Sequence, residues 1–232
     1  MATAEIEVPT EGLPSLADAN RDISRPISTP YKRFWLLLGI CGALIAAAGV
    51  AWAIQIRDGM GMAGINNPVN WGVYIVTFVF WVGIAHSGTL ISAVLYLVRS
   101  GWRTTINRTA EAMTIFAVMT AGLFPLIHLG RVWYFYYLVP YPSTRLLWPN
   151  FRSPLVWDMF AIGTYFTISL VFWYLGLIPD LAILRDKFSG IKKKLYGAFS
   201  LGWTGSVRDW AHYRRLYLYL AGIATPLVLS VH

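Results

Sequence analysis

Five long apolar runs constrain the fold of this sequence more than any other feature. About 20 consecutive apolar residues are needed to cross the hydrocarbon core of a bilayer as a helix. The sequence therefore predicts an all-α integral membrane protein, a transmembrane helix bundle with five visible spans. The predicted spans lie near residues 34–54, 71–98, 112–138, 155–180 and 213–232.

The composition agrees with a membrane protein. Of the 232 residues, 56% are hydrophobic and 13% are charged, whereas a soluble domain carries about 25% charged residues. The net charge of +8 could suggest binding to nucleic acid. However, basic residues in the short connections between apolar runs are typical of membrane topology. We therefore expect contact with the lipid bilayer and none with nucleic acid.

The basic residues are distributed unevenly between the two ends of the predicted spans. Fifteen Lys and Arg residues lie in the N-terminal segment and around the second and fourth connections, against three in the first and third connections. Lys and Arg concentrate on the cytoplasmic side of membrane proteins. Residues 1–33 are therefore predicted to form a cytoplasmic N-terminal arm and residues 34–232 the transmembrane bundle, with the first and third connections facing outward.

Three smaller features limit the chemistry of the chain. Cys41 is the only cysteine, so this chain cannot hold an iron–sulfur cluster by itself, and any such cluster is expected in a partner. The pattern G-x-G-x-x-G at residues 59–64 follows a predicted membrane span instead of a strand, which favours an outer loop over a nucleotide site. The last apolar run reaches His232 without a basic or aromatic anchor, so we expect the sequence to be the front part of a longer protein.

Three ionisable residues lie in the third and fourth apolar runs, although charged groups at membrane depth are rarely kept without a role. His128 and Arg131, in FPLIHLGRVW, are three residues apart and would share one helix face. Asp158, in SPLVWDMF, lies about one turn inside the membrane edge. The short connection between the two runs predicts antiparallel neighbouring helices. We therefore expect the three side chains to converge near the outer face.

Two interpretations of this group stay open from the residues alone. In the first, Arg131 pairs with Asp158 and His128 donates a hydrogen bond to a neighbouring helix, so the group only packs helices. In the second, the group forms a protonatable pocket, because histidine titrates at about pH 6.5 and a desolvated carboxyl group can hold a proton. Such a pocket could accept protons from a lipid-soluble donor.

His86, in GIAHSGTLIS, falls near the midplane of the second run. It could be satisfied by hydroxyl and backbone groups inside the bundle, or it could act as a haem ligand or a proton relay. A haem held by two histidines needs both at one depth on different helices. The spacing of His86 and His128 alone does not exclude such a haem.

Four motifs, AHSGT (85–89), NRTAEAMT (107–114), FPLIHLGR (124–131) and SPLVWD (153–158), together resemble the quinone subunits of the polysulfide-reductase type, the NrfD/PsrC family. The resemblance covers about residues 65–232. Within the family it is greatest to the ActC subunits of alternative complex III. It implies that the five visible spans are the front part of a subunit with about eight to ten spans.

The resemblance also implies a function in a respiratory or photosynthetic quinol oxidoreductase complex of the bacterial inner membrane. Menaquinol would be oxidised to menaquinone near the outer face, with no haem, iron–sulfur cluster or metal in this chain and with proton translocation as an additional expectation. The expected partners are an iron–sulfur subunit, multihaem cytochrome c subunits and a second NrfD-like membrane subunit. The expected catalytic residues are His128 and Asp158, with Arg131 as a further quinol contact and His86 as a residue of a proton path.

Three other functions stay open beside this one. The chain could be a non-catalytic membrane anchor for peripheral redox subunits, a haem b membrane subunit or a transporter. The anchor would use its buried charges only for helix packing. The haem subunit would use His86 or His128 as an iron ligand.

Overall fold

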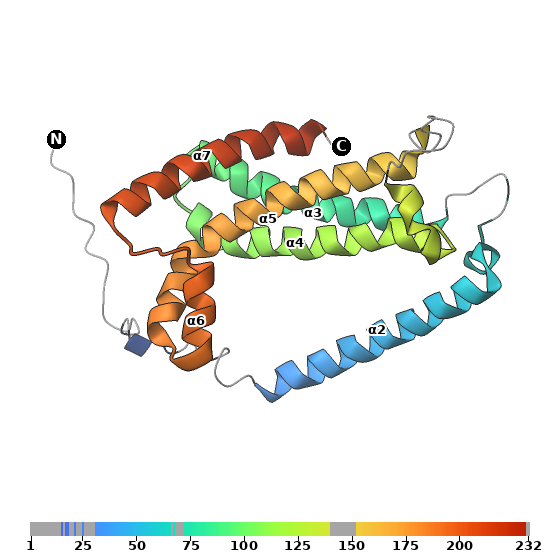
Figure 1. Cartoon of the computed structure of the whole chain (residues 1–232), viewed down its shortest axis with the longest axis horizontal. Helices are drawn as coiled ribbons and strands as arrows, with labels where there is room; N and C mark the ends of the chain where they lie inside the picture. Colours follow the sequence, from blue (N-terminus) through green and yellow to red (C-terminus); the bar gives the residue numbers. More distant parts are fainter. Residues whose placement is uncertain are drawn as a thin grey trace. The chain divides into compact units, whose positions relative to one another are not determined.

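The computed structural model describes residues 31–65, 67, 72–139 and 152–230, together with positions 15, 17, 18, 21 and 25. The long regular elements in these ranges are all helices (Figure 1). Most of the predicted N-terminal arm and the final residue, His232, lie outside the described part. The elements are α2 (Lys32–Asp58), the 3-10 helix η1 (Met60–Ala63), α3 (Val73–Leu97), α4 (Arg103–His128), the 3-10 helix η2 (Val132–Leu138), α5 (Pro154–Lys187), α6 (Gly190–Phe199) and α7 (Val207–Ser230).

Four of the described helices are long and apolar enough to cross a membrane. They are α2, α3 and α5 over their whole lengths, and α4 from Ile106 to His128. This confirms the prediction of an all-α membrane bundle. Among the described helices, α7 does not meet the same criterion, because Arg208, Asp209, Arg214 and Arg215 fall in its first half. A fifth span over 213–232 stays a prediction.

The chain divides into two compact units, one up to Ile54 and one from Gln55 onward. In the larger unit, α3 packs against α4 and α7, while α5 packs against α4, α6 and α7 (Figure 1). The antiparallel pairing of α4 with α5 is the arrangement that the short connection between the third and fourth apolar runs predicts. Two buried clusters hold the unit together, one around Phe172 and Tyr217 and the other around Tyr165.

The helix observed in place of the predicted third span, 112–138, differs from it at both ends. It starts earlier, at Arg103, because polar side chains of its first turns are buried in the bundle; Glu111, for example, is only 2% exposed. It stops at His128, because Gly130 adopts a left-handed φ of 69° and redirects the chain. A Cβ atom on Gly130 would also lie 2.8 Å from the Cγ atom of Met60, so the backbone conformation and the available space both favour glycine there. The aromatic run WYFYY consequently lies in η2, outside the spanning helix.

The fourth connection also has more structure than the sequence predicts. α5 continues to Lys187, beyond the expected end at residue 180, and α6 follows it as a separate helix that carries the basic run 192–194. The glycine pattern at 59–64 forms η1 directly after α2. In the described part of the chain no strand precedes this pattern, so the context that a dinucleotide site needs is missing there.

Candidate functional site

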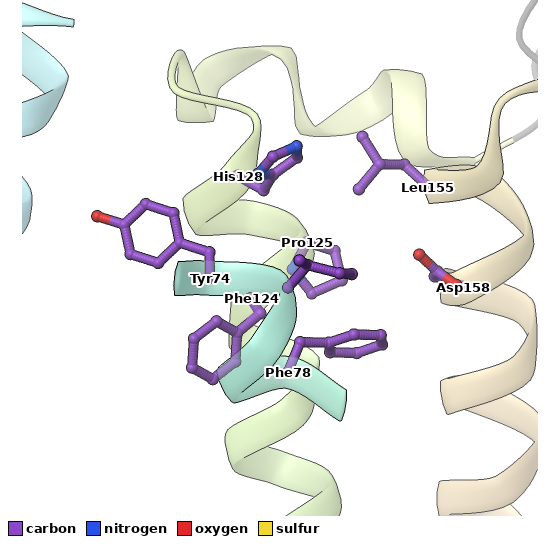
Figure 2. Close-up of a pocket in the computed structure, with 8 residues that line it drawn as sticks. Tyr74, Phe78, Phe124, Pro125, His128, Leu155 and Asp158 are labelled. Carbon is purple, nitrogen blue, oxygen red and sulfur yellow. The ribbon is translucent and has the colours of Figure 1, made fainter. Parts of the chain in front are cut away.

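A pocket between α3, α4 and α5 brings His128 and Asp158 to one space (Figure 2). His128 is the last residue of α4, and Asp158 lies in the early turns of α5. The pocket is open on one side and has about 270 Å³ of empty space. The structure therefore unites two of the predicted site residues. The rest of the lining is apolar or aromatic and consists of Tyr74, Ile75, Phe78, Phe124, Pro125 and Leu155.

Two helix ends position these side chains. Pro154 occupies the start of α5, where its missing N–H group and fixed φ suit a helix start, and Asp158 follows about one turn later. Both Asp158 and His128 are half-buried. Because the spanning part of α4 runs from Ile106 to His128, His128 lies about 16 Å from the middle of the span at 1.5 Å per residue. His128 is thus nearer the membrane edge than the predicted span would have placed it.

Arg131 does not join His128 and Asp158. Because α4 ends first, Arg131 has a non-helical backbone, with φ −101° and ψ 89°, and it does not share a helix face with His128. Its side chain is exposed and outside the pocket lining. Among the described residues, the ion pairs include neither Arg131 nor Asp158. The ion pair expected between these two residues is therefore not formed.

Gln55, close to the end of α2, is a residue of this region that sequence reasoning missed. It is 5% exposed, and the Tyr74 hydroxyl donates a hydrogen bond to its side-chain oxygen. The Gln55 Nε2 group donates to the carbonyl oxygen of Ile127 at 3.3 Å, directly before His128. In Figure 2 the Tyr74 hydroxyl points away from the other pocket residues, so its ring forms the wall. A glutamine directly after the first apolar run, 34–54, was the available signal.

His86 lies in a second pocket, which adjoins the first because Phe78 and Asp158 line both. This second pocket has a volume of about 780 Å³. The ring of His86, which is 7% exposed, contacts the ring of Tyr165 edge to face, with centroids 4.7 Å apart. The Tyr165 hydroxyl donates a hydrogen bond to the Ala85 carbonyl oxygen at 2.7 Å. Asp158 therefore stands between a pocket containing His128 and a pocket containing His86.

A buried acidic group, Glu111, lies deeper in the bundle and was given no role from the sequence. Ser92 donates a hydrogen bond to its carboxylate at 2.5 Å, and Tyr217 donates a second. The guanidinium groups of Arg103 and Arg108 lie 3.7 Å and 3.8 Å from the same carboxylate. The predicted spans left both arginines in the second connection, because the sequence does not show whether a charged side chain is buried or exposed.

The described residues offer little to a metal ion or a haem. No group of three or more His, Cys, Asp or Glu side chains that could hold a metal occurs among them. His86 lies midway along α3, whereas His128 ends α4, so the two histidines sit at different depths and in different pockets. They do not form the pair at one depth that a haem between these helices would require.

Comparison with known proteins gives one family and two relatives. The family described as "Polysulphide reductase, NrfD" matches residues 61–232. A putative membrane subunit of dimethyl sulfoxide reductase from Halobacterium salinarum is 29% identical over 222 residues, which cover 94% of this chain and 46% of that protein. A subunit of selenate reductase from Mesobacillus selenatarsenatis is 28% identical over 200 residues, which cover 82% of this chain and 45% of that protein.

The chain spans less than half the length of these two curated relatives. Neither is named as an ActC subunit. The comparisons therefore support the resemblance to the NrfD/PsrC family but not the finer resemblance to the ActC subunits. The family match includes every residue that lines the two pockets. A match over most of the chain, in a protein with four membrane-length helices, shows that this protein belongs to the NrfD family of polysulphide reductase membrane proteins.

Proposed function

We propose that this chain is the quinol-binding part of a membrane subunit that passes electrons from the quinol to a partner protein. The observation that carries the proposal is the convergence of His128 and Asp158 on one largely apolar pocket. A quinol headgroup is a flat ring with two hydroxyl groups. It therefore needs apolar walls for the ring and polar acceptors at the edge, as small-molecule sites commonly provide.

The two ionisable side chains have separate roles in this proposal. His128 accepts a hydrogen bond and then a proton from one quinol hydroxyl, since an imidazole titrates near neutral pH. Asp158 orients the histidine or takes the proton onward. Oxidation of the quinol to the quinone releases two electrons, which pass to an iron–sulfur cluster of a partner, and two protons. Arg131, which is exposed and outside the pocket lining, is left out of the proposed ligand contacts.

The second pocket supports a further step of the same proposal. Asp158 lines both pockets, so a proton that it holds could move toward His86 as well as outward. His86 therefore stays a candidate for a proton path. We propose menaquinol as the substrate and the outer face as the side of oxidation, in agreement with the excess of basic residues at the opposite ends of the helices.

Two kinds of complex fit this role. The names of the two relatives favour a reductase complex in which this subunit accompanies a catalytic and an iron–sulfur subunit. The four motifs quoted above favour alternative complex III, with multihaem cytochrome c subunits and a second NrfD-like subunit. Isolation of the intact complex distinguishes the two. Covalently bound haem in copurified subunits supports alternative complex III. Quinol-dependent reduction of dimethyl sulfoxide or selenate without such haem supports the reductase complex.

The central test is turnover of the intact complex carrying Asp158→Asn or His128→Gln. We expect quinol-dependent reduction of the acceptor to fall by about a hundredfold, the usual contribution of a positioned acid or base, with normal assembly. Asp186→Asn is the matched control for the carboxylate, because Asp186 lies on the same helix, outside the pocket, and pairs with Arg185. His212→Gln, at an exposed position on α7, is the control for the histidine. Full turnover of assembled Asp158→Asn would remove Asp158 from the mechanism.

The alternative functions predict different results in the same preparations. A non-catalytic anchor would contain no quinone after purification and would not respond to quinone-site inhibitors. A haem b subunit would show a Soret band that disappears when His86 or His128 is replaced. A transporter would move its substrate without a redox partner. Extraction of the bound quinone would also identify its chemical type.

A further inference from the structure

A second kind of site lies at the other end of the bundle from His128, where α3 ends, α4 begins and α7 passes beside them (Figure 1). The cavity there has a volume of about 1010 Å³. Its wall contains four arginines and hydroxyl-bearing side chains. The residues that matter for its chemistry are Tyr96, Arg99, Ser100, Arg103, Arg214 and Arg215.

One of these arginines, Arg103, is fixed in place as part of the wall. It is 9% exposed, its Nε donates to the Ser92 carbonyl oxygen at 3.2 Å, and its guanidinium group lies over the rings of Tyr96 and Tyr217 at 4.7 Å and 4.6 Å. Its Nη2 atom is 3.7 Å from Glu111. The charge of Arg103 is therefore largely balanced inside the protein.

The other three arginines retain their positive charge for a ligand. All three are exposed, and in the described part of the chain none of them pairs with an acidic side chain. The hydroxyl of Tyr96 donates to the Arg214 carbonyl oxygen at 3.0 Å, which ties the end of α3 to α7. Arg99, Arg214 and Arg215 are thus held around one cavity with a net positive charge.

A tight backbone turn joins α3 to α4 at this cavity. Arg99 adopts a left-handed φ of 54°, and the Ser100 N–H donates to the Leu95 carbonyl oxygen at 2.9 Å, which is the turn that closes a helix end. The chain then starts α4 at Arg103, whose backbone N–H donates to the Ser100 carbonyl oxygen at 3.4 Å. The N-terminal end of α4 carries a partial positive charge, which adds to the effect of the arginines.

Large apolar side chains surround this charged cavity. Val98 is 65% exposed, Trp102 60% and Leu218 48%. Val98 and Trp102 flank the ends of α3 and α4, two helices long and apolar enough to cross the membrane, where a tryptophan is typical of the interface. A ligand for this place therefore needs an anionic head and apolar chains, and basic pockets between membrane helices are known to hold such lipid head groups.

We propose that the cavity between α3, α4 and α7 binds the phosphate group of an anionic phospholipid, with Arg99, Arg214 and Arg215 as its ligands. The acyl chains would lie along the exposed apolar side chains beside the cavity. This site is separate from the pocket of His128 and Asp158, and its lipid would act as a structural ligand that joins α7 to α3.

The test measures phospholipid retained by the intact complex, by native mass spectrometry after exchange into mild detergent. The probes are phosphatidylglycerol, phosphatidylcholine and inorganic phosphate. Wild-type complex should retain phosphatidylglycerol in preference to phosphatidylcholine. The variant Arg99→Gln/Arg214→Gln/Arg215→Gln should bind it less tightly, by about fivefold for each arginine removed. The matched control is Lys192→Gln/Lys193→Gln/Lys194→Gln, which removes the same charge from exposed positions on α6.

Three outcomes would overturn the proposal. The first is equal retention of phosphatidylglycerol and phosphatidylcholine by the wild-type complex, a comparison that does not depend on any variant. The second is equal loss of lipid in the arginine variant and the lysine control. The third is displacement of the lipid by millimolar inorganic phosphate, together with a rise in the Tm of the complex as large as the rise that the lipid gives. This result would make the site one for a free anion.

Discussion

The hydroxyl of Tyr217 on α7 donates a hydrogen bond to the carboxylate of Glu111 on α4, which precedes it by 106 positions in the chain. Ser92 of α3 donates to the same oxygen at 2.5 Å. One carboxylate thus joins three helices, and both Tyr217 and Ser92 are completely buried. Because an unpaired polar group in such a place is costly, the three residues restrict how these helices can pack.

Tyr217→Phe should lower the stability of the bundle by about 1–2 kcal/mol, since the buried Glu111 carboxylate loses a donor. The expected fall in Tm is roughly 2–8 °C for a chain of this size. Thermal unfolding of the purified complex, followed by fluorescence-detected size exclusion, provides the measurement. Tyr219→Phe is the matched control, because Tyr219 is on the same helix and 65% exposed. Equal Tm values for the two variants would contradict the role of the Tyr217 hydroxyl.

Gly88→Ala should separate α3 from α4. A Cβ atom at Gly88 would collide with the Thr114 hydroxyl and the Ala110 carbonyl oxygen, and membrane helices often approach closely through small residues. We expect a loss of about 1–3 kcal/mol, measured as the fraction of monodisperse complex after heating. Gly83→Ala, on the same helix, has open space around its Cβ position and should behave as wild type. A stable Gly88→Ala complex would show that the two helices can move apart without cost.

Tyr74→Phe tests the link between Gln55 and the pocket. Loss of the hydrogen bond to Gln55 should loosen the aromatic wall and raise the KM for quinol about threefold to tenfold, the equivalent of roughly 1 kcal/mol. The Gln55→Leu variant should have a similar effect, and the two effects should not add. Thr77→Val, at a half-buried position outside the pocket lining on the same helix, is the control. A fall in kcat without a change in KM would instead place the Tyr74 hydroxyl in the chemical step.

The start of α7 should depend on pH through Asp209. Its carboxylate accepts hydrogen bonds from the Thr204 hydroxyl at 2.6 Å and the Thr204 N–H at 3.1 Å, and these lower the pKa of Asp209 from 3.8 to about 2. Because the pKa in the folded state is the lower one, the stabilisation is present above pH 3.8 and is lost as the pH falls toward 2.

Hydrogen exchange of the complex near neutral pH, where Asp209 is ionised, measures how much its carboxylate stabilises the turn. Asp209→Asn should speed exchange of the Thr204 and Ser206 amides, since both N–H groups donate to Asp209. Asp58→Asn, which removes a carboxylate paired with Arg57 at the end of α2, should not. Unchanged exchange at both amides in Asp209→Asn would show that the loop holds α7 without the carboxylate.

The broad architecture could be read from the chain because it depends on local composition. A run of about 20 apolar residues must form a helix in lipid, wherever its neighbours lie. The short connection between α4 and α5 likewise predicted that these helices pair, and the pair brings His128 near Asp158. The start of α7 also has a local signal in the sequence, a capping pattern at Ser206 and Asp209. In the structure the Ser206 Oγ accepts a hydrogen bond from the Asp209 N–H at 3.2 Å. The prediction followed the apolar run instead and placed the start of this segment at residue 213.

The remaining features needed the packed bundle. α4 ends just before Gly130, which lies beside Met60. Because the helix ends there, Arg131 is not helical and does not share a helix face with His128. Glu111 and Gln55 are polar residues whose burial depends on partners elsewhere in the chain, such as Tyr217 and Tyr74. Hydropathy averages neighbouring residues, so it cannot register a single hydrogen bond between distant helices. Local chemistry therefore decides that the chain spans the membrane, and contacts across the bundle decide which polar side chains meet.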